Sequence, residues 1–396
     1  MLLAFVGKPN VGKSTFFKAI TTLDIAIANY PFTTIKSNHG VGYVKINCPD
    51  KEFNLNCNPS HGFCVNHNRF VPIEIMDLAG LVPGASEGKG LGNQFLDDLR
   101  QADAFVHIVD ISGTTDSEGK STENHDPLED IKFLEEELDK WFLNILLKAW
   151  KIFVKKIETE PKENFSKTIA KQFSGLKVTE ENVKDVIRKE NLPEKISLWD
   201  NDVLMRFASS LRKESKPTVI IANKIDKEKS KENYQKLKLE FPNSVIIPCS
   251  ADSELALREA QKAGLIEYIP GEKGFKITGN LNEKQKLALD KIKKEILDKF
   301  ENGTGVQEVL NYVVLDLLKY IAIYPIRSVN KLIDGKGNIL PDCFLMPQGS
   351  TSLDLAFLLH TDFGNNFIKA IDARTKKVLG KDYVLKHQDV IEIVTK

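Results

Sequence analysis

The chain has 396 residues, of which 42% are hydrophobic, and its 55 Lys and Arg residues balance 55 Asp and Glu residues. This composition excludes a wholly disordered chain, and zero net charge excludes binding of nucleic acid through a globally basic surface. No uncharged apolar stretch is long enough to span a bilayer and no secretory signal is recognisable, while five cysteines fit a reducing compartment. We therefore expect a cytoplasmic protein without membrane contact.

Short apolar segments rich in β-branched residues alternate with helix-like stretches over the first two thirds of the chain. We expect buried strands at residues 2–6, 71–76, 104–109, 218–222 and 244–248. Strands separated by helices predict a mostly parallel sheet with helices on both faces, which is a three-layer α/β fold.

About a hundred residues between the third and fourth of these strands contain no convincing strand. One apolar helical stripe is expected there, formed by Ile131, Leu134, Leu138, Trp141, Ile145, Ala149 and Ile152. Residues 148–177 hold eight Lys and three Glu, which is either a solvated helix face or a docking patch. We interpret this stretch as a helical insertion.

Near residue 323 the sequence pattern changes to one of short strands and turns. Strands are expected at residues 328–333, 343–346, 367–371 and 390–394, with one helix at 352–361. The chain is thus divided into 1–125 (first part of an α/β domain), 126–216 (helical insertion), 217–322 (second part and a helical connector) and 323–396 (a small α+β domain).

A phosphate-binding loop is expected directly after the first strand. The motif G-x-x-x-x-G-K-S is formed by Gly7, Lys8, Pro9, Asn10, Val11, Gly12, Lys13 and Ser14. It follows a strand and opens a helix, so its backbone amides and the helix N-terminus favour phosphate. Lys13 can reach the β- and γ-phosphates, and the Ser14 hydroxyl can bind magnesium.

Two further segments are suited to sense the γ-phosphate. Asp77 follows the second strand and can hold magnesium through water, and Gly80 can offer its backbone amide to the γ-phosphate. Thr33 and Thr34 are both candidates to complete the magnesium shell, and we favour Thr34. The alternative is that both threonines are ordinary strand formers.

A base-recognition motif follows the fourth strand. Asp226 can accept hydrogen bonds from the ring N–H and the exocyclic amine of guanine, a donor pair that adenine lacks. Asn223 would support the phosphate loop, and the stem of Lys224 would lie along the base. Ser250 and Ala251, after the fifth strand, can offer backbone amides to the guanine carbonyl.

These motifs resemble the Obg family of translation-factor-class GTPases, and its YchF-like branch above all. The residues that carry the resemblance are 30–34, 77–92 and 95–100. Residues 345–356, 360–362 and 388–394 resemble a TGS domain, which is a β-grasp module. The resemblance implies a P-loop G domain with a helical insertion and a C-terminal TGS domain.

The same resemblance implies magnesium-dependent GTP binding with slow hydrolysis, in a nucleotide switch linked to the ribosome or RNA. A nucleotide-sensing adaptor that binds a protein partner is the alternative. Lys13, Thr34 and Gly80 would carry the catalytic step, and Asn10 stands where some related GTPases hold potassium.

The chain departs from its relatives at two positions. The YchF-like branch often lacks an intact base motif, whereas Asn223-Lys-Ile-Asp226 is complete here and favours GTP. Leu81 stands where Ras-like GTPases place a glutamine that orients water, and leucine cannot do so. Another loop, a metal or a partner would have to supply that group.

Thiols and imidazoles are dense in one short segment, which contains Cys48, Cys57, His61, Cys64 and His67. Such ligands can bind zinc, but the spacing lacks a C-x-x-C pair, so a polar hairpin tip with incidental cysteines is the favoured interpretation. Three further residues, Cys249, Cys343 and His107, are expected to belong to the core.

Overall fold

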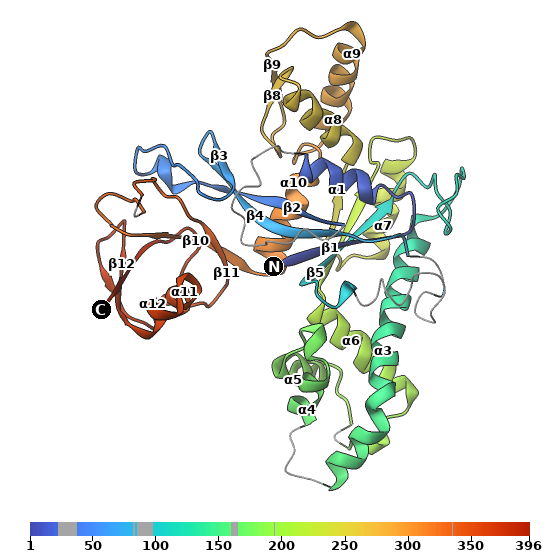
Figure 1. Ribbon diagram of the computed structural model, residues 1–396. Coiled ribbons are helices and arrows are strands. Elements are labelled where there is room, and N and C mark those ends of the chain that lie inside the picture. The colour runs from blue at the N-terminus through green and yellow to red at the C-terminus, as the bar shows by residue number, and fades with distance from the viewer. Residues whose placement is uncertain (23–37, 82–83, 85–97, 160–164, 194, 335) are drawn as a thin grey trace.

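A computed structural model describes residues 1–22, 38–81, 84, 98–159, 165–193, 195–334 and 336–396 (Figure 1). Its main sheet has the order β2-β4-β1-β5-β6-β7, and β3 pairs with β4. The strands are β1 (Leu2–Val6), β2 (His39–Asn47), β3 (Phe63–Val65), β4 (Asn68–Asp77), β5 (Ala104–Asp110), β6 (Thr218–Asn223) and β7 (Ile246–Pro248). All five expected strands are present, and β4, β1, β5, β6 and β7 run parallel.

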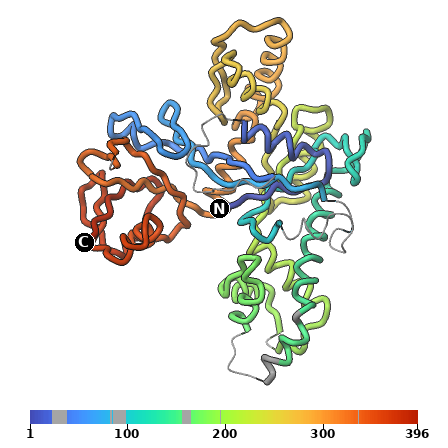
Figure 2. Tube along the Cα trace, viewed as in Figure 1, coloured from blue at the N-terminus to red at the C-terminus, as the bar shows by residue number. Residues whose placement is uncertain are grey.

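Strands β2 and β3 were not foreseen, and both pair antiparallel with β4. In β2, the half-exposed positions and glycines at the start of the strand replace the continuous apolar run of a buried strand, because β2 forms the edge of the sheet. Together the three strands form a long hairpin that leaves the main sheet (Figure 2).

The two faces of the sheet follow from the alternation of side chains along β1. Leu3 and Phe5 pack with α1 (Lys13–Thr21) and α10 (Val306–Asn311) on one face. Leu2, Ala4 and Val6 point to the opposite face and pack against the helical insertion. The expected three-layer α/β architecture is therefore confirmed.

The helical insertion consists of α3 (Pro127–Thr159), α4 (Phe165–Gln172), α5 (Glu180–Lys189) and α6 (Asn201–Ser215). The expected apolar stripe is correct through Trp141, but Ile152 is 75% exposed. The buried face continues instead through Phe142, Leu146 and Trp150, at steps of four residues. Because an α-helix has 3.6 residues per turn, the buried stripe shifts gradually around a helix of this length. The stripe expected from the sequence did not include that shift.

The remaining helices flank the nucleotide motifs or link the two domains. Helices α7 (Ser230–Glu240) and α8 (Ala251–Lys262) follow β6 and β7, and α8 packs on α1. Strands β8 (Ile266–Tyr268) and β9 (Phe275–Ile277) project with α9 (Glu283–Ile292) at the end opposite to the insertion (Figure 1). None of the helices in the described part of the chain is long and apolar enough to cross a membrane.

The C-terminal domain has its own sheet, ordered β11-β10-β14-β12-β13. Its elements are β10 (Tyr320–Ile326), β11 (Phe344–Pro347), α11 (Ser352–Leu359), α12 (Thr361–Asn365), β12 (Phe367–Asp372), β13 (Val378–Leu379) and β14 (Val390–Thr395). The expected strand at 328–333 is wrong, because that segment folds back on itself in a turn that joins Ser328 to Ile333 by a single bridge. Leu332 in this turn has φ of 53°, which no extended strand allows.

The C-terminal domain packs on the hairpin of the α/β domain (Figure 2). Val44 and Ile46 of β2 share one hydrophobic cluster with Ala322 and Tyr324 of β10. The two domains are therefore joined by buried apolar surface as well as by the chain itself.

Candidate nucleotide-binding site

The phosphate loop connects β1 to α1 and takes backbone conformations that favour glycine. Gly7 has φ of 146° and Gly12 has φ of 99°. A Cβ atom on Gly7 would lie 2.4 Å from the Ile108 carbonyl oxygen, and one on Gly12 would lie 2.3 Å from Asn223 Nδ2. Both glycines are thus required by close contacts with β5 and with the base motif.

Lys13 is buried at the start of α1. Its Nζ donates a hydrogen bond to the Lys8 carbonyl oxygen at 2.8 Å. Burial lowers the pKa of Lys13 to about 8, and the nearby Asp77 charge only partly opposes that effect. A phosphate group at this position would stabilise the charged form of Lys13.

Ser14 and Asp77 meet beside Lys13, although they are far apart in sequence. Ser14 Oγ donates to Asp77 Oδ2 at 2.8 Å. Burial raises the pKa of Asp77, against the hydrogen bond from Ser14 and the charge of Lys13. Within the described residues, Asp77 Oδ1 is buried without a hydrogen-bond partner. A hydroxyl and an unsatisfied carboxylate oxygen are oxygen ligands that fit Mg²⁺.

The segment after Asp77 lies against the phosphate loop. A Cβ atom on Gly80 would approach the Pro9 nitrogen to 2.6 Å, so the two backbones are in contact. The Leu81 amide donates to the Gly7 carbonyl oxygen at 3.1 Å, and the Leu81 side chain is only 2% exposed. Thr33 and Thr34, and most of the segment that follows Leu81, lie outside the described residues.

The base motif is tied to the phosphate loop by Asn223. Asn223 Nδ2 donates to the Val11 carbonyl oxygen at 2.8 Å, and Asn223 Oδ1 accepts from the Ala251 amide at 3.1 Å. One buried amide side chain therefore joins the phosphate loop, β6 and the start of α8.

Asp226 and Lys224 of the same motif have partners of their own. Ser250 Oγ donates to Asp226 Oδ1 at 2.8 Å, which orients a carboxylate that remains partly accessible. Lys224 Nζ donates to the Asn10 carbonyl oxygen at 3.0 Å and to Asp110 Oδ2 at 2.9 Å.

Asp110, at the end of β5, was not foreseen by the sequence analysis. It is fully buried and accepts hydrogen bonds from Ser112 Oγ at 2.5 Å, from Thr115 Oγ1 at 3.0 Å and from Lys224. Burial disfavours its charge, but the hydrogen bond from Ser112 and the Lys224 ammonium outweigh burial and lower the pKa of Asp110. A carboxylate at the carboxyl end of a central strand is the signal that could have found it.

The side chains of Lys8 and Asn10 make contacts with segments outside the phosphate loop. Lys8 Nζ is buried 2.8 Å from Asp130 Oδ2 and donates to the Thr115 carbonyl oxygen at 2.6 Å. Asn10 Nδ2 donates to the Gly119 carbonyl oxygen at 2.8 Å. Their backbones remain available to a nucleotide, while their side chains attach the loop after β5 and helix α3.

Two of the three residues expected in the core are buried. His107 in β5 is 2% exposed, and burial lowers its pKa to about 3. Cys249 is fully buried, whereas Cys343 is half-buried.

Known protein families match the chain in three places. The models are a 50S ribosome-binding GTPase over residues 2–148, an Obg-like GTPase YGR210-like, G4 motif-containing domain over 221–328, and a TGS domain over 334–395. Together with the sheet and the phosphate loop, they define a P-loop GTPase that ends in a TGS domain. The chain belongs to the Obg-like family of these GTP hydrolases, in its YchF-like branch.

Three relatives illustrate this membership. An uncharacterized GTP-binding protein of Methanocaldococcus jannaschii is 48% identical over 396 residues, which is 100% of this chain and 99% of that protein. The crystal structure of a GTP-binding protein from Pyrococcus horikoshii OT3 has a TM-score of 0.79 and 42% identity, with both chains covered completely. A ribosome-binding ATPase YchF of Buchnera aphidicola subsp. Acyrthosiphon pisum is 29% identical over 98% of this chain and 97% of its own.

Proposed function

We propose that the protein is a cytoplasmic, magnesium-dependent GTP-binding switch with slow hydrolysis, which acts on a ribosomal or RNA surface. The observation that carries the nucleotide part is the Asn223 side chain, which holds the phosphate loop and the start of α8 in one unit. The bond from Ser250 Oγ to Asp226 Oδ1 connects the Asp226 carboxylate to the same unit. A guanine base and its phosphates can then be bound together.

In this proposal the protein contributes position and charge more than chemistry. Lys13 stabilises negative charge on the phosphates, and Ser14 with Asp77 holds Mg²⁺. When bound, Mg²⁺ neutralises charge on the β- and γ-phosphates. Thr34 and Gly80 would sense the γ-phosphate and release their segments once it is lost. Hydrolysis is slow because buried Leu81 offers water neither donor nor acceptor.

Potassium is a further candidate cofactor, and Asn10 is the residue that would hold it. The hydrogen bond from Asn10 Nδ2 to Gly119 fixes the amide, so Asn10 Oδ1 would be the cation ligand. Such a cation would supply positive charge that an arginine provides in other GTPases. Faster hydrolysis in potassium than in sodium, abolished in Asn10→Ala, is the expected result. Equal rates in the two salts would contradict it.

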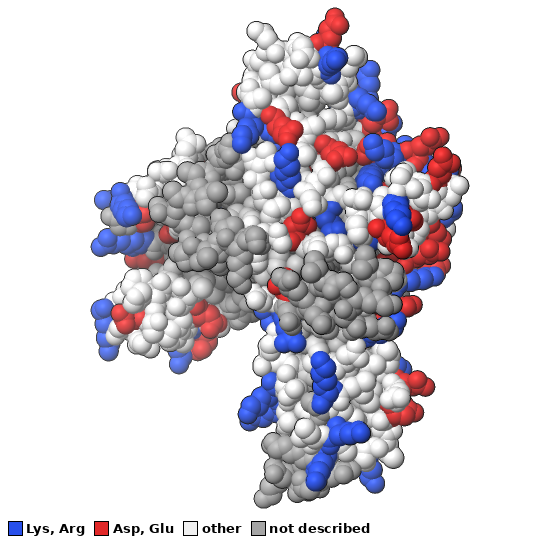
Figure 3. Space-filling view, turned by 45° about the vertical axis from the view of Figure 1, so that its right-hand side comes forward, with Lys and Arg blue, Asp and Glu red and all other residues white. Residues whose placement is uncertain are grey.

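The proposal that the protein binds a ribosomal or RNA surface rests on the distribution of charge. Residues 148–177 hold an excess of five positive charges, and Lys and Arg side chains are spread over the insertion in Figure 3. The C-terminal segment 325–396 has only ten Lys and Arg against eight Asp and Glu. We therefore assign electrostatic attraction to the insertion (126–216) and specificity to the TGS domain (323–396), with the nucleotide bound by 1–125 and 217–322.

Co-sedimentation with ribosomal subunits in GTP and in GDP tests this proposal. We expect association that depends on which nucleotide is bound, because loss of the γ-phosphate relaxes the segments near the phosphate loop. If the protein binds GTP but never sediments with subunits or RNA, the alternative, an adaptor for a protein partner with incidental hydrolysis, becomes the better description.

A further inference from the structure

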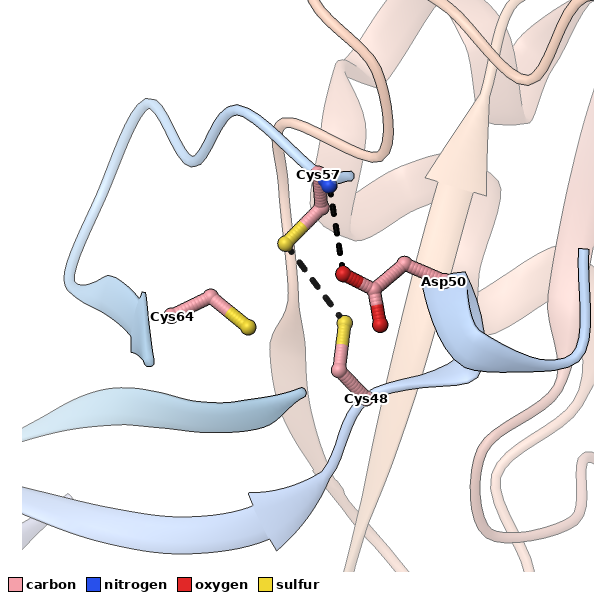
Figure 4. Close-up of side chains that lie close together, drawn as sticks. All are labelled: Cys48, Asp50, Cys57 and Cys64. Atoms are coloured by element: carbon pink, nitrogen blue, oxygen red, sulfur yellow. Dashed lines mark hydrogen bonds between the residues drawn. The ribbon is translucent and has the colours of Figure 1, made fainter. Parts of the chain in front are cut away.

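Three cysteines from the segment that connects β2 to β4 meet at the tip of the β2–β4 hairpin (Figure 4). Cys48 follows β2, Cys57 lies in the next loop, and Cys64 is in β3. Asp50, in the short helical turn Pro49–Lys51, points its carboxylate into the same space. The three Sγ atoms and one carboxylate oxygen all lie within 4.8 Å of one another.

The spacing of this group suits a tetrahedral metal site. Cys48 Sγ and Cys57 Sγ are 3.6 Å apart. Two thiolates bound to one zinc at about 2.3 Å stand roughly 3.8 Å apart in a tetrahedron. A disulfide would need about 2.05 Å, and both cysteines are free.

Neighbouring side chains orient the ligands and balance their charge. His67 Nδ1 is 2.9 Å from Asp50 Oδ1, and the Cys57 amide donates to Asp50 Oδ2 at 3.2 Å. Arg69 is fully buried, and its Nη1 donates to Cys57 Sγ at 3.8 Å. Three thiolates and a carboxylate around Zn²⁺ carry a net charge of −2, so the Arg69 guanidinium supplies needed positive charge.

We propose that Cys48, Cys57, Cys64 and Asp50 bind one structural Zn²⁺ ion. Binding displaces three thiol protons and leaves no open coordination position, so the site is not catalytic. Soft thiolates select zinc over magnesium, which keeps this site distinct from the nucleotide site. His61, which the sequence placed in the same segment, is not a member of the group.

The position of the site suggests what the metal stabilises. The hairpin loop contacts the C-terminal domain through two backbone hydrogen bonds. The backbone amide of Asn58 donates to the Ile339 carbonyl oxygen at 2.8 Å, and that of Ser60 donates to the Pro341 carbonyl oxygen at 2.9 Å. Arg69, beside Cys57, donates to the carbonyl oxygens of Leu340 and Pro341. Zinc would hold this loop in the conformation on which the C-terminal domain packs.

Metal analysis of the full-length protein tests the proposal. Protein produced in zinc-supplemented medium and then desalted is expected to hold one Zn²⁺ per chain. Removal by a chelator and addition of Co²⁺ should give visible absorption of tetrahedral cobalt and a thiolate-to-cobalt charge-transfer band. The chelated protein should unfold at a lower temperature than the zinc form, because metal binding free energy contributes to folding.

The control distinguishes this cluster from cysteines in general. Cys57→Ser and Cys64→Ser should lose the zinc and the cobalt bands, whereas Cys343→Ser, in a nearby cysteine outside the group, should keep both. Should either serine variant fail to fold, the cobalt spectrum of the wild-type chain still decides. Wild-type protein without zinc or a thiolate–cobalt band, or with a disulfide between Cys48 and Cys57, overturns the proposal.

Discussion

At the scale of single residues, we propose that Asp226 is the group that selects the base. In Asp226→Asn the acceptor pair for guanine is lost, so we expect GTP binding to weaken by about 1–3 kcal/mol, roughly 5- to 150-fold. Xanthine carries a carbonyl where guanine carries an amine, so the new amide should favour xanthosine triphosphate. Nucleotide titrations of both ligands measure this exchange.

An exposed acidic residue in α9 offers a matched control for this substitution. Asp290→Asn removes the same charge far from the base motif and should leave both affinities unchanged. Wild-type protein that binds ATP as tightly as GTP would refute the assignment of Asp226.

Because the pKa of Lys13 is lowered to about 8, we expect nucleotide binding to be sensitive to pH. Below about pH 8 Lys13 carries its charge in the free protein, and above it a proton must be taken up before the phosphates are bound. The affinity for GDP should therefore be flat below pH 8 and fall above it, by up to about tenfold per pH unit. Titration calorimetry between pH 7 and 9.5 measures this profile.

Arginine at position 13 tests whether the pKa of Lys13 causes the fall in affinity. Lys13→Arg stays charged throughout this range, so its affinity, though reduced, should not change with pH. A variant that keeps the fall above pH 8 would show that another group titrates.

At the scale of elements, the Lys8–Asp130 ion pair attaches the phosphate loop to the first turn of α3. Both side chains are at most 5% exposed, and His125 Nε2 lies 2.7 Å from Asp130 Oδ1. Asp130→Asn leaves the Lys8 charge buried without a counter-ion and should cost about 3–5 kcal/mol of stability. Thermal and denaturant unfolding measure the loss.

Two comparisons show whether burial is the cause. Lys8→Met combined with Asp130→Leu removes both charges and should recover most of the stability. Glu240→Gln breaks the exposed Lys132–Glu240 pair, 3.1 Å apart, and should cost less than about 1 kcal/mol. Similar losses in Asp130→Asn and Glu240→Gln would contradict the argument.

Elements also mark where sequence-based prediction succeeded. The strands β1, β5 and β6 were located because each is a nearly continuous apolar run buried on both faces. The edge strand β2 was missed because only part of it is buried, and the helices that contact it, α1 and α10, lie on either side of it in the sequence, α10 more than 250 residues away. Strand propensity is the weakest guide where packing against other segments decides whether a strand forms.

At the scale of the whole molecule, removal of the C-terminal domain is a poor test of docking. The cut would remove Ala322 and Tyr324 from the buried apolar cluster that they share with Val44 and Ile46. Charge reversal in the full chain is sharper. Replacement of the exposed Lys148, Lys151 and Lys171 by Glu should abolish ribosome or RNA association at moderate salt and leave GTP affinity unchanged.

The matched variant carries the same three-charge reversal at Lys284, Lys286 and Lys291, on α9 at the opposite end of the molecule (Figure 1). It should sediment with subunits like the wild type. Equal loss of ribosome or RNA association in both variants would show that net charge alone is the cause. Unchanged association in both variants would favour the adaptor function.

The sequence alone determined the nucleotide motifs and their order, because each is a short contiguous string whose chemistry depends on a strand that ends beside it. Tertiary structure alone decided three things: that Cys48, Cys57 and Cys64 meet at Asp50, that Lys8 turns away to Asp130, and that the C-terminal domain covers the hairpin. Each of these depends on side chains that are brought together by strand pairing and packing between distant segments. Spacing along the chain does not encode such distances, because they are set by which surfaces bury one another.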